Sequence, residues 1–243
     1  MMPKSAVVHS WLDTPRGRAL LTGETQLMCD ALQDVFGWEL VQVGRWGVPH
    51  ALIRSARTRR ALEISSARSP SASDVMARLA QLPLASDSVD AIVLPHTLEF
   101  EVDPHAVLRE VDRVLTGEGQ LLVLGFRPFS LWGLRALWAR QGFPPGLRQV
   151  LSERRIRDWL VLLGYAVEPV RHYLFDFPWG QPRAASARLR RGLLNPLPAG
   201  AWMLRARKRV YAAPSTRLKL RERARVLAPL AKPAANRHGS HGN

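Results

Sequence analysis

The chain has 243 residues, 47% of them hydrophobic and 23% charged, an ordinary composition for a globular protein that buries one substantial core. No apolar run approaches the roughly 18 to 20 residues that cross a bilayer, and the first residues lack the apolar stretch of a secretory signal, so we expect a soluble cytoplasmic protein. A single cysteine, Cys29, excludes an internal disulfide framework and a cysteine-based zinc site.

The net charge of +15 is distributed unevenly. Residues 183–243 contain 15 Lys and Arg and one acid, Glu222, whereas residues 1–182 contain 20 basic and 19 acidic residues. Any attraction to phosphate or to an anionic surface is therefore expected from the C-terminal quarter, not from a basic groove across the domain.

The first half of the chain alternates helical and strand-like patterns. Apolar residues between Pro15 and Phe36 recur three, four and seven positions apart, which predicts an amphipathic helix lying against a sheet. Three apolar runs predict buried strands: Trp38–Val43, Ala61–Ile64 and Val89–Leu94. The third is followed by a predicted helix that begins at Pro104 and ends near Gly117.

The second half continues the alternation. A buried strand is predicted over Leu121–Phe126, and two helices follow, one over Pro128–Arg140 and one capped by Ser152 and ending at Gly164. Two further strands are predicted over Ala166–Phe175 and Ala201–Val210. Strands separated by helices predict a doubly wound α/β fold with a mostly parallel sheet, and the last two strands are close enough in sequence for an antiparallel edge. The predicted divisions are a helical extension over 1–37, the α/β domain over 38–213 and a basic disordered tail over 214–243.

The stretch from Leu82 to Phe126 resembles the core of the class I, type-11-like methyltransferase family. The matching positions are a Leu-Pro pair, a Ser-x-Asp before a strand, and an Asp-Pro-led helix with Arg-Glu, Arg-Val-Leu and a Gly-x-Gly turn: Leu82, Pro83, Ser88, Asp90, Asp103, Pro104, Arg109, Glu110, Arg113, Val114, Leu115, Gly117 and Gly119. The resemblance covers roughly residues 38–210. It implies a seven-stranded Rossmann-like sheet and S-adenosylmethionine as cofactor.

In that family the cofactor lies beyond the carboxyl ends of the strands, at the point where strand order reverses. A glycine loop after the first strand approaches the methionyl end, and a carboxylate at the end of the second strand accepts hydrogen bonds from the ribose hydroxyls. The resemblance places the loop at Gly44, Arg45, Trp46 and Gly47, and the carboxylate at Glu63. Leu82, Pro95 and His96 complete the implied cofactor-binding set.

Several of these positions depart from the family pattern. The usual acid of the first-strand motif is Gln42, and Trp46 replaces the middle glycine. Trp46 either forms an aromatic wall of the pocket or fills it, and bulky residues at glycine positions more often obstruct. Glu63 is either the ribose ligand or a solvated charge at a strand end, and the Gly44–Gly47 pair is either a cofactor loop or a tight turn.

His96 follows the central strand, where the family places residues that face the transferred methyl group. It is the candidate catalytic residue, as a general base, or else a histidine bonded to backbone. Glu99 and Glu101 are expected to be exposed acids near the mouth of the site. No cluster of His, Asp and Glu has metal-ligand spacing.

Three functions follow from these patterns. The first is a methyltransferase acting on an unidentified small-molecule or macromolecular acceptor. The second is a methyltransferase-like binding module that has lost the cofactor, and the third is an RNA-associated factor that uses the basic tail. The tail lacks the aromatic residues of a single-strand binding platform, so nucleic acid is not the expected partner.

Overall fold

A computed structural model describes residues 4–66, 73–139, 143–175, 177–179 and 198–210. Met1–Arg209 form one compact unit, and a second unit begins at Val210. The described helices are α1 (Lys4–Leu12), α2 (Pro15–Leu32), α3 (Thr97–Phe100), α4 (Pro104–Val114), α5 (Leu131–Trp138) and α6 (Glu153–Leu162). The described strands are β1 (Phe36–Val43), β2 (Arg57–Ser65), β3 (Val75–Met76), β4 (Val89–Pro95), β5 (Leu115–Phe126), β6 (Tyr165–Val167), β7 (Arg171–Tyr173) and β8 (Ala201–Lys208).

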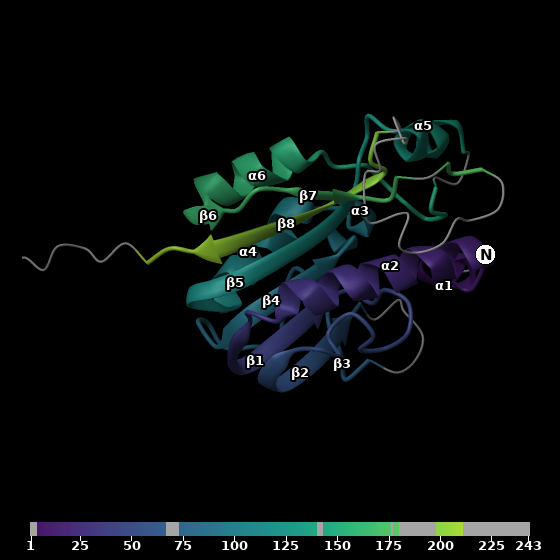
Figure 1. Cartoon of the computed structure of the whole chain (residues 1–243). Helices are drawn as coiled ribbons and strands as arrows, with labels where there is room; N and C mark the ends of the chain where they lie inside the picture. Colours follow the sequence, from purple (N-terminus) through teal and green to yellow (C-terminus); the bar gives the residue numbers. More distant parts are fainter. Residues whose placement is uncertain (1–3, 67–72, 140–142, 176, 180–197, 211–243) are drawn as a thin grey trace, which may run out of the picture. The chain divides into compact units, whose positions relative to one another are not determined.

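The strands form a single sheet in the order β3-β2-β1-β4-β5-β8-β6, with the short β7 also paired to β8 (Figure 1). β3, β2, β1, β4 and β5 are parallel, whereas β8 runs antiparallel to β5, β6 and β7. This confirms the predicted doubly wound, mostly parallel sheet with an antiparallel edge, although the described residues form eight strands and not the seven that the resemblance implies. Strand order reverses between β1 and β4, so the carboxyl ends of these two strands define the switch point.

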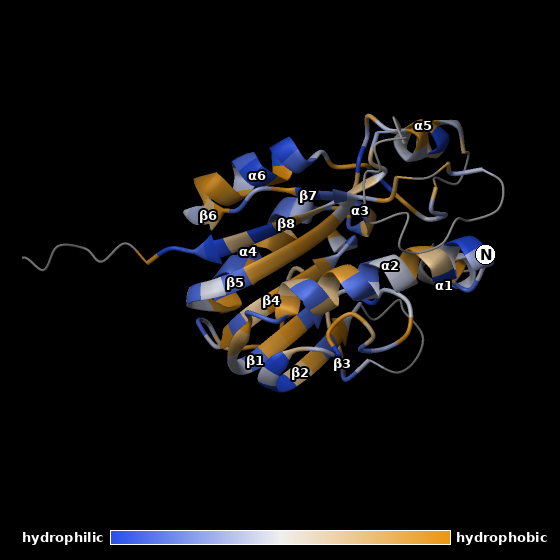
Figure 2. Cartoon of the chain, in the orientation of Figure 1, coloured by the Kyte–Doolittle hydropathy of each residue, from blue (hydrophilic) through white to orange (hydrophobic). Residues whose placement is uncertain are grey.

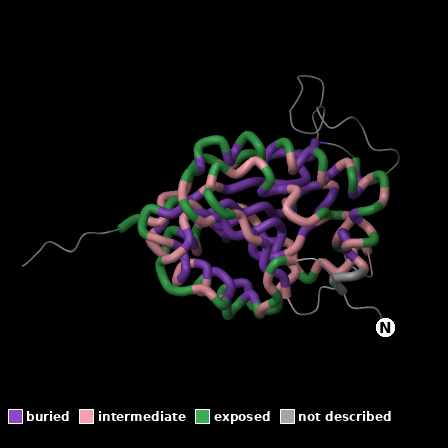
Figure 3. Tube along the Cα trace, turned by 90° about the horizontal axis from the view of Figure 1, so that it is seen from below, coloured by how far each residue is buried: buried purple, intermediate pink, exposed green. Residues whose placement is uncertain are grey.

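Helices cover both faces of the sheet, as α/β layering requires. α2 packs on one face, where Leu20, Met28 and Leu32 join alternate residues of the central strands. α4 and α6 cover the other face through residues such as Val107 and Ile156. The central strands are correspondingly apolar along their length (Figure 2) and buried between helices whose outer sides are exposed (Figure 3).

The helix starts follow from local sequence. Thr14 and Ser152 cap α2 and α6, their hydroxyls accepting the N–H of Gly17 and Arg155, and the Asp103 carboxylate accepts that of Ala106 at α4. The predicted cap at Ser152 is thereby confirmed. Among the described helices, none is both long enough and apolar enough to span a bilayer.

Several predicted elements differ in the structure: the helix from Pro104 ends at Val114, so Gly117 lies within β5, and the helix predicted over Pro128–Arg140 spans Leu131–Trp138. The strand predicted over Ala166–Phe175 is divided into β6 and β7, and Pro169 lies between them; a proline has no N–H to donate to the ladder. The N-terminal helix ends at Leu32 instead of Phe36, because Val35 closes a turn onto the Leu32 carbonyl and β1 begins directly afterwards. The predicted tail over 214–243 lies outside the described residues.

Candidate functional site

The candidate site lies at the carboxyl ends of β1 and β4. Gly44 follows β1 with a φ of 94°, a backbone conformation that favours glycine, and donates its N–H to the Ile64 carbonyl at 2.8 Å. The Thr97 hydroxyl donates to the Val43 carbonyl at 2.5 Å, so its side chain lies against Gly44, where a Cβ would overlap it. The predicted glycine turn is present, and Thr97 packs directly onto it.

Glu63 and Gln42 lie side by side, because β1 and β2 are paired in that register. One Glu63 oxygen accepts the His50 backbone N–H at 3.1 Å and the Gln42 amide N–H at 3.3 Å; Gln42 also donates to the Gly44 carbonyl. Because the Gly44 carbonyl and the Glu63 carboxylate both accept from the Gln42 amide nitrogen, they fix the orientation of that amide. The remaining oxygens, Glu63 Oε1 and Gln42 Oε1, are buried with no hydrogen-bond partner among the described residues.

Burial dominates the electrostatics of Glu63. It raises the pKa of this carboxyl, and the hydrogen bond from the His50 backbone only partly offsets that shift. Asp74 stands nearby, accepting the Glu63 backbone N–H and pairing with the His50 ring at 2.7 Å. Glu63 is thus a buried acid held in place from one side, with its second oxygen unsatisfied; a solvated charge at a strand end does not describe it.

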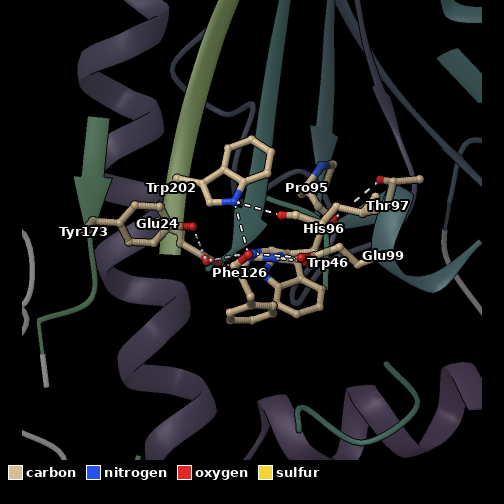
Figure 4. Close-up of polar contacts among 10 residues, drawn as sticks. Glu24, Trp46, Pro95, His96, Thr97, Glu99, Phe126, Tyr173 and Trp202 are labelled. Carbon is tan, nitrogen blue, oxygen red and sulfur yellow. Dashed lines mark hydrogen bonds and ion pairs between the residues drawn. The ribbon is translucent and has the colours of Figure 1, made fainter. Parts of the chain in front are cut away.

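Trp46 points into the core. Its indole is 2% exposed, donates its N–H to Glu24 on α2 at 2.6 Å, and lies 4.5 Å from the His96 ring between centroids (Figure 4). Phe100 and Phe126 complete its surroundings at 5.9 and 6.4 Å. Trp46 is therefore packed against α2 and His96, whereas the side chain that lies against Gly44 is Thr97.

His96 is the centre of a buried polar network (Figure 4). Its Nε2 lies 2.8 Å from Glu24 and its Nδ1 lies 3.0 Å from Glu99. The Tyr173 hydroxyl donates to the same Glu24 oxygen that faces His96, at 2.9 Å. The other Glu99 oxygen accepts the Phe126 backbone N–H at 2.9 Å, and the imidazole stacks on the Phe126 ring at 4.1 Å.

The network holds a positive charge in the interior. Burial lowers the pKa of His96, but the charges and hydrogen bonds of Glu24 and Glu99 outweigh this effect and raise it to about 9. Burial raises the pKa of Glu99, and both burial and the Glu24 charge raise that of Tyr173. At neutral pH His96 is therefore an imidazolium that donates from both nitrogens, and in this conformation it has no lone pair for an acceptor's proton.

The structure brings most of the predicted residues together but separates one. Gly44, Trp46 and His96 share the switch point, with Pro95 as the last residue of β4 and Arg45 half-buried in the turn. Leu82 packs among the residues facing α4, and its backbone N–H is bonded to Glu110. The expectation that Glu99 is exposed is wrong, because its carboxylate is buried against His96.

Sequence reasoning missed two members of the network, Glu24 and Tyr173. A signal for Glu24 was available, since it lies four residues after Leu20 and four before Met28, within the inward stripe of the helix. Tyr173 offered no such signal, because only the pairing of β7 with β8 brings it to α2. Among the described residues no group of His, Cys, Asp and Glu is arranged to hold a metal ion.

These features define a doubly wound α/β protein with a polar site at its switch point, the class that binds nucleotide-like cofactors. Residues 42–123 match the family model described as a methyltransferase domain. The uncharacterized protein YafS of Escherichia coli is 32% identical over 183 residues, 74% of each chain. A malonyl-[acyl-carrier protein] O-methyltransferase of Halorhodospira halophila is 27% identical over 134 residues, 50% of this chain and 45% of that protein.

Solved structures show the same fold. A chain of the complex between the Haloferax volcanii Trm112 methyltransferase activator and a putative methyltransferase aligns with a TM-score of 0.59 at 14% identity, over 86% of this chain and 99% of that one. A possible histamine N-methyltransferase of Thermotoga maritima aligns at 0.53 and 19% identity, over 78% and 89%. The chain therefore belongs to the class I S-adenosylmethionine-dependent methyltransferase family.

Proposed function

We propose that this chain transfers a methyl group from S-adenosylmethionine to an acceptor that its sequence does not identify, and that Glu63 and Gln42 hold the adenosyl end of the cofactor. The observation that carries the proposal is the pair of buried, unpartnered oxygens at the carboxyl ends of β1 and β2. A buried acceptor without a donor is costly, by about 1–3 kcal/mol for a neutral group and more for a charged one.

A ribose diol supplies the missing donors. Its two hydroxyls present two O–H groups on adjacent carbons, and Glu63 Oε1 and Gln42 Oε1 are acceptors on neighbouring paired residues. Donors at Glu63 stabilise its charged form and counteract the burial that raises its pKa. The chemistry of this pair therefore fits the ribose, and the cofactor when bound supplies an electrophilic methyl group.

The methionyl end requires a rearrangement. Thr97 takes up the space beside Gly44, and Trp46, from the same turn, is buried against Glu24 and His96, so under this proposal binding of the whole cofactor moves the Trp46 indole. That movement breaks the hydrogen bond from Trp46 to one Glu24 oxygen, while the other Glu24 oxygen still faces His96. Under this proposal His96 acts as a general base only after one ring nitrogen has been released, and otherwise positions the groups around it.

Titration calorimetry with S-adenosylmethionine and S-adenosylhomocysteine tests the proposal. Micromolar or tighter binding is expected for the wild-type chain. Glu63→Ala removes a charged acceptor and is expected to weaken binding by about 2–3 kcal/mol, roughly 30- to 150-fold. Glu39→Ala, an acid on the same strand as Gln42 that pairs with Arg60, is the matched control and is expected to bind normally. Equal affinities for the two variants would overturn the assignment of Glu63.

The contact of Thr97 with Gly44 and the burial of Trp46 favour a second candidate, a methyltransferase-fold binding module that does not hold the cofactor. Trp46→Gly separates the two, because it restores the middle glycine of the family pattern and removes the indole from the core. Binding by the wild-type chain supports the enzyme. Binding by Trp46→Gly alone, with no heat from the wild-type chain, supports the module and identifies Trp46 as the residue that excludes the cofactor.

A further inference from the structure

His50 and Asp74 form a side-chain pair beside Glu63, the proposed ribose ligand. His50 lies in the loop between β1 and β2, and Asp74 directly precedes β3, the strand that pairs with the carboxyl end of β2 (Figure 1). The Nε2 atom of the His50 ring lies 2.7 Å from an Asp74 oxygen, and both side chains are partly exposed. Neither residue belongs to the cofactor-binding set that the family resemblance implies, so their role is inferred from their contacts.

Three hydrogen bonds join these two residues and Glu63 into a closed ring. Asp74 Oδ2 accepts from the His50 ring and, at 2.7 Å, from the Glu63 backbone N–H. The His50 backbone N–H in turn donates to Glu63 Oε2 at 3.1 Å. The ring of bonds therefore holds the Glu63 carboxylate through Oε2, while Oε1 is the oxygen that has no partner among the described residues.

The bond between His50 and Asp74 does not depend on the charge of the imidazole. Burial raises the pKa of Asp74, but the hydrogen bonds from the Glu63 backbone and the His50 ring outweigh this effect and lower that pKa below its ordinary value. Asp74 is therefore a carboxylate at neutral pH, and a carboxylate only accepts hydrogen bonds. It follows that Nε2 of His50 carries a proton in both the neutral and the charged ring.

The backbone of His50 explains why the loop needs a side-chain anchor. Its φ of 59° lies in the left-handed region, which is strained for a residue with a Cβ. The His50 carbonyl accepts the Ile53 N–H at 3.1 Å, and the Ile53 side chain is buried in the core. The ring bond to Asp74 on one side and the Ile53 turn on the other hold the His50 N–H in place against Glu63.

We propose that His50 and Asp74 are positioning residues for Glu63: together they hold its carboxylate so that Oε1 stays available to the ribose of the cofactor. This inference rests on the proposed function, because it assigns the two residues through the ligand that Glu63 is proposed to bind. A pair that only stabilised the loop would affect folding and would leave the affinity of the folded chain unchanged.

Calorimetric titration of the full chain with S-adenosylhomocysteine provides the test. His50→Asn removes the ring but keeps the backbone N–H, and asparagine tolerates the left-handed conformation. Asp74→Ala removes the shared acceptor. Each variant is expected to bind about fivefold more weakly than the wild-type chain, and the double variant within about twofold of Asp74→Ala, because all three open the same ring of bonds.

Two further measurements separate positioning from a general effect on the fold. In a Glu63→Ala background, Asp74→Ala is expected to change the affinity by less than about twofold, because the carboxylate that it positions is gone. In the free chain, exchange of the His50 amide hydrogen followed by NMR is expected to be roughly tenfold faster or more in Asp74→Ala than in the wild-type chain.

The matched control is Glu118→Asn. Glu118 is also a non-glycine residue with a left-handed φ, 66°, and it pairs with Arg207 at 2.9 Å, but it lies near the amino end of β5, away from the candidate site. Its variant is expected to bind within about twofold of the wild-type chain. Circular dichroism is expected to show the wild-type fold in all of these variants.

The outcomes distinguish this inference from the proposed function. If the wild-type chain binds S-adenosylhomocysteine and both single variants bind it equally well, the positioning role is overturned and the proposed function stands. The same holds if Asp74→Ala weakens binding equally with and without Glu63, or if Glu118→Asn loses as much affinity as His50→Asn. A wild-type chain that binds neither S-adenosylmethionine nor S-adenosylhomocysteine overturns the proposed function and this inference with it.

Discussion

The substitution Glu24→Gln tests whether the buried network stabilises the fold. Glu24 accepts three hydrogen bonds, from His96 and Tyr173 to one oxygen and from Trp46 to the other. The amide keeps the shape of the side chain and one acceptor oxygen. Its N–H₂ group must then face a donor, and the negative charge opposite the His96 imidazolium is lost.

The cost follows from those contacts. The Trp46 N–H loses its acceptor in the interior, which costs about 1–3 kcal/mol. His96 loses one of the two carboxylates that hold its charge, and breaking a buried ion pair by removing one partner costs about 3–5 kcal/mol when no acceptor remains. Since the amide oxygen keeps the hydrogen bond to His96, we expect the free energy of unfolding to fall by about 3 kcal/mol, a large share of the roughly 5–15 kcal/mol of a typical domain.

Urea unfolding followed by circular dichroism measures this change. The midpoint is expected to fall while the dependence of the unfolding free energy on urea stays constant, because the surface exposed on unfolding is the same. Asp30→Asn, an exposed acid on the same helix, is the control and is expected to lie within about 0.5 kcal/mol of the wild-type chain. A Glu24→Gln variant as stable as Asp30→Asn would refute the account of the network.

Other predictions concern the same site. The pKa of His96 is raised in the folded chain, so the stabilisation that its charge provides is present below the unfolded pKa near 6.5 and is lost as pH rises through about 9. In that window the free energy of unfolding is expected to fall by about 1.4 kcal/mol per pH unit. In the His96→Gln variant, the midpoint of urea unfolding is expected to vary less with pH across the same window. Gly44→Ala is expected to lower thermal stability, because it places a Cβ against Thr97 at a φ of 94°. Gly23→Ala, inside α2 with no atom within 4 Å of the new Cβ, is expected to raise stability by about 0.5–1 kcal/mol in the same melting experiment.

The fold could be predicted from sequence because its strands are buried on both faces. Runs such as Val89–Leu94 are almost continuously apolar, and continuous runs between helical patterns are typical of parallel sheets. The boundary errors arose where a backbone detail decided the outcome, as at Pro169 between β6 and β7. A backbone detail of this kind changes where a helix or strand begins or ends, but the element stays in the same helix layer or sheet of the fold.

The site could be predicted only in part, because pattern identifies positions and does not show what fills the space between them. The family pattern located Gly44, Glu63 and His96 at or beside the switch point, but the burial of Trp46 depends on an acceptor that α2 supplies from 22 residues away. The partners of His96 come from α2 and α3, and Tyr173 reaches the network through a strand pairing. No spacing along the chain encodes these contacts.

The position of Glu24 connects cofactor binding to the state of His96. The same carboxylate accepts the Trp46 indole N–H on one oxygen and faces the imidazolium on the other. An indole that leaves the core takes a donor away from Glu24, so the carboxylate binds its two remaining donors more strongly and favours the charged form of His96 further. Displacing Trp46 is therefore not sufficient to make His96 a base. Deprotonation of Nε2 at neutral pH also requires that the Glu24 carboxylate leave it, and this ties base catalysis through Nε2 to a movement of the Glu24 side chain.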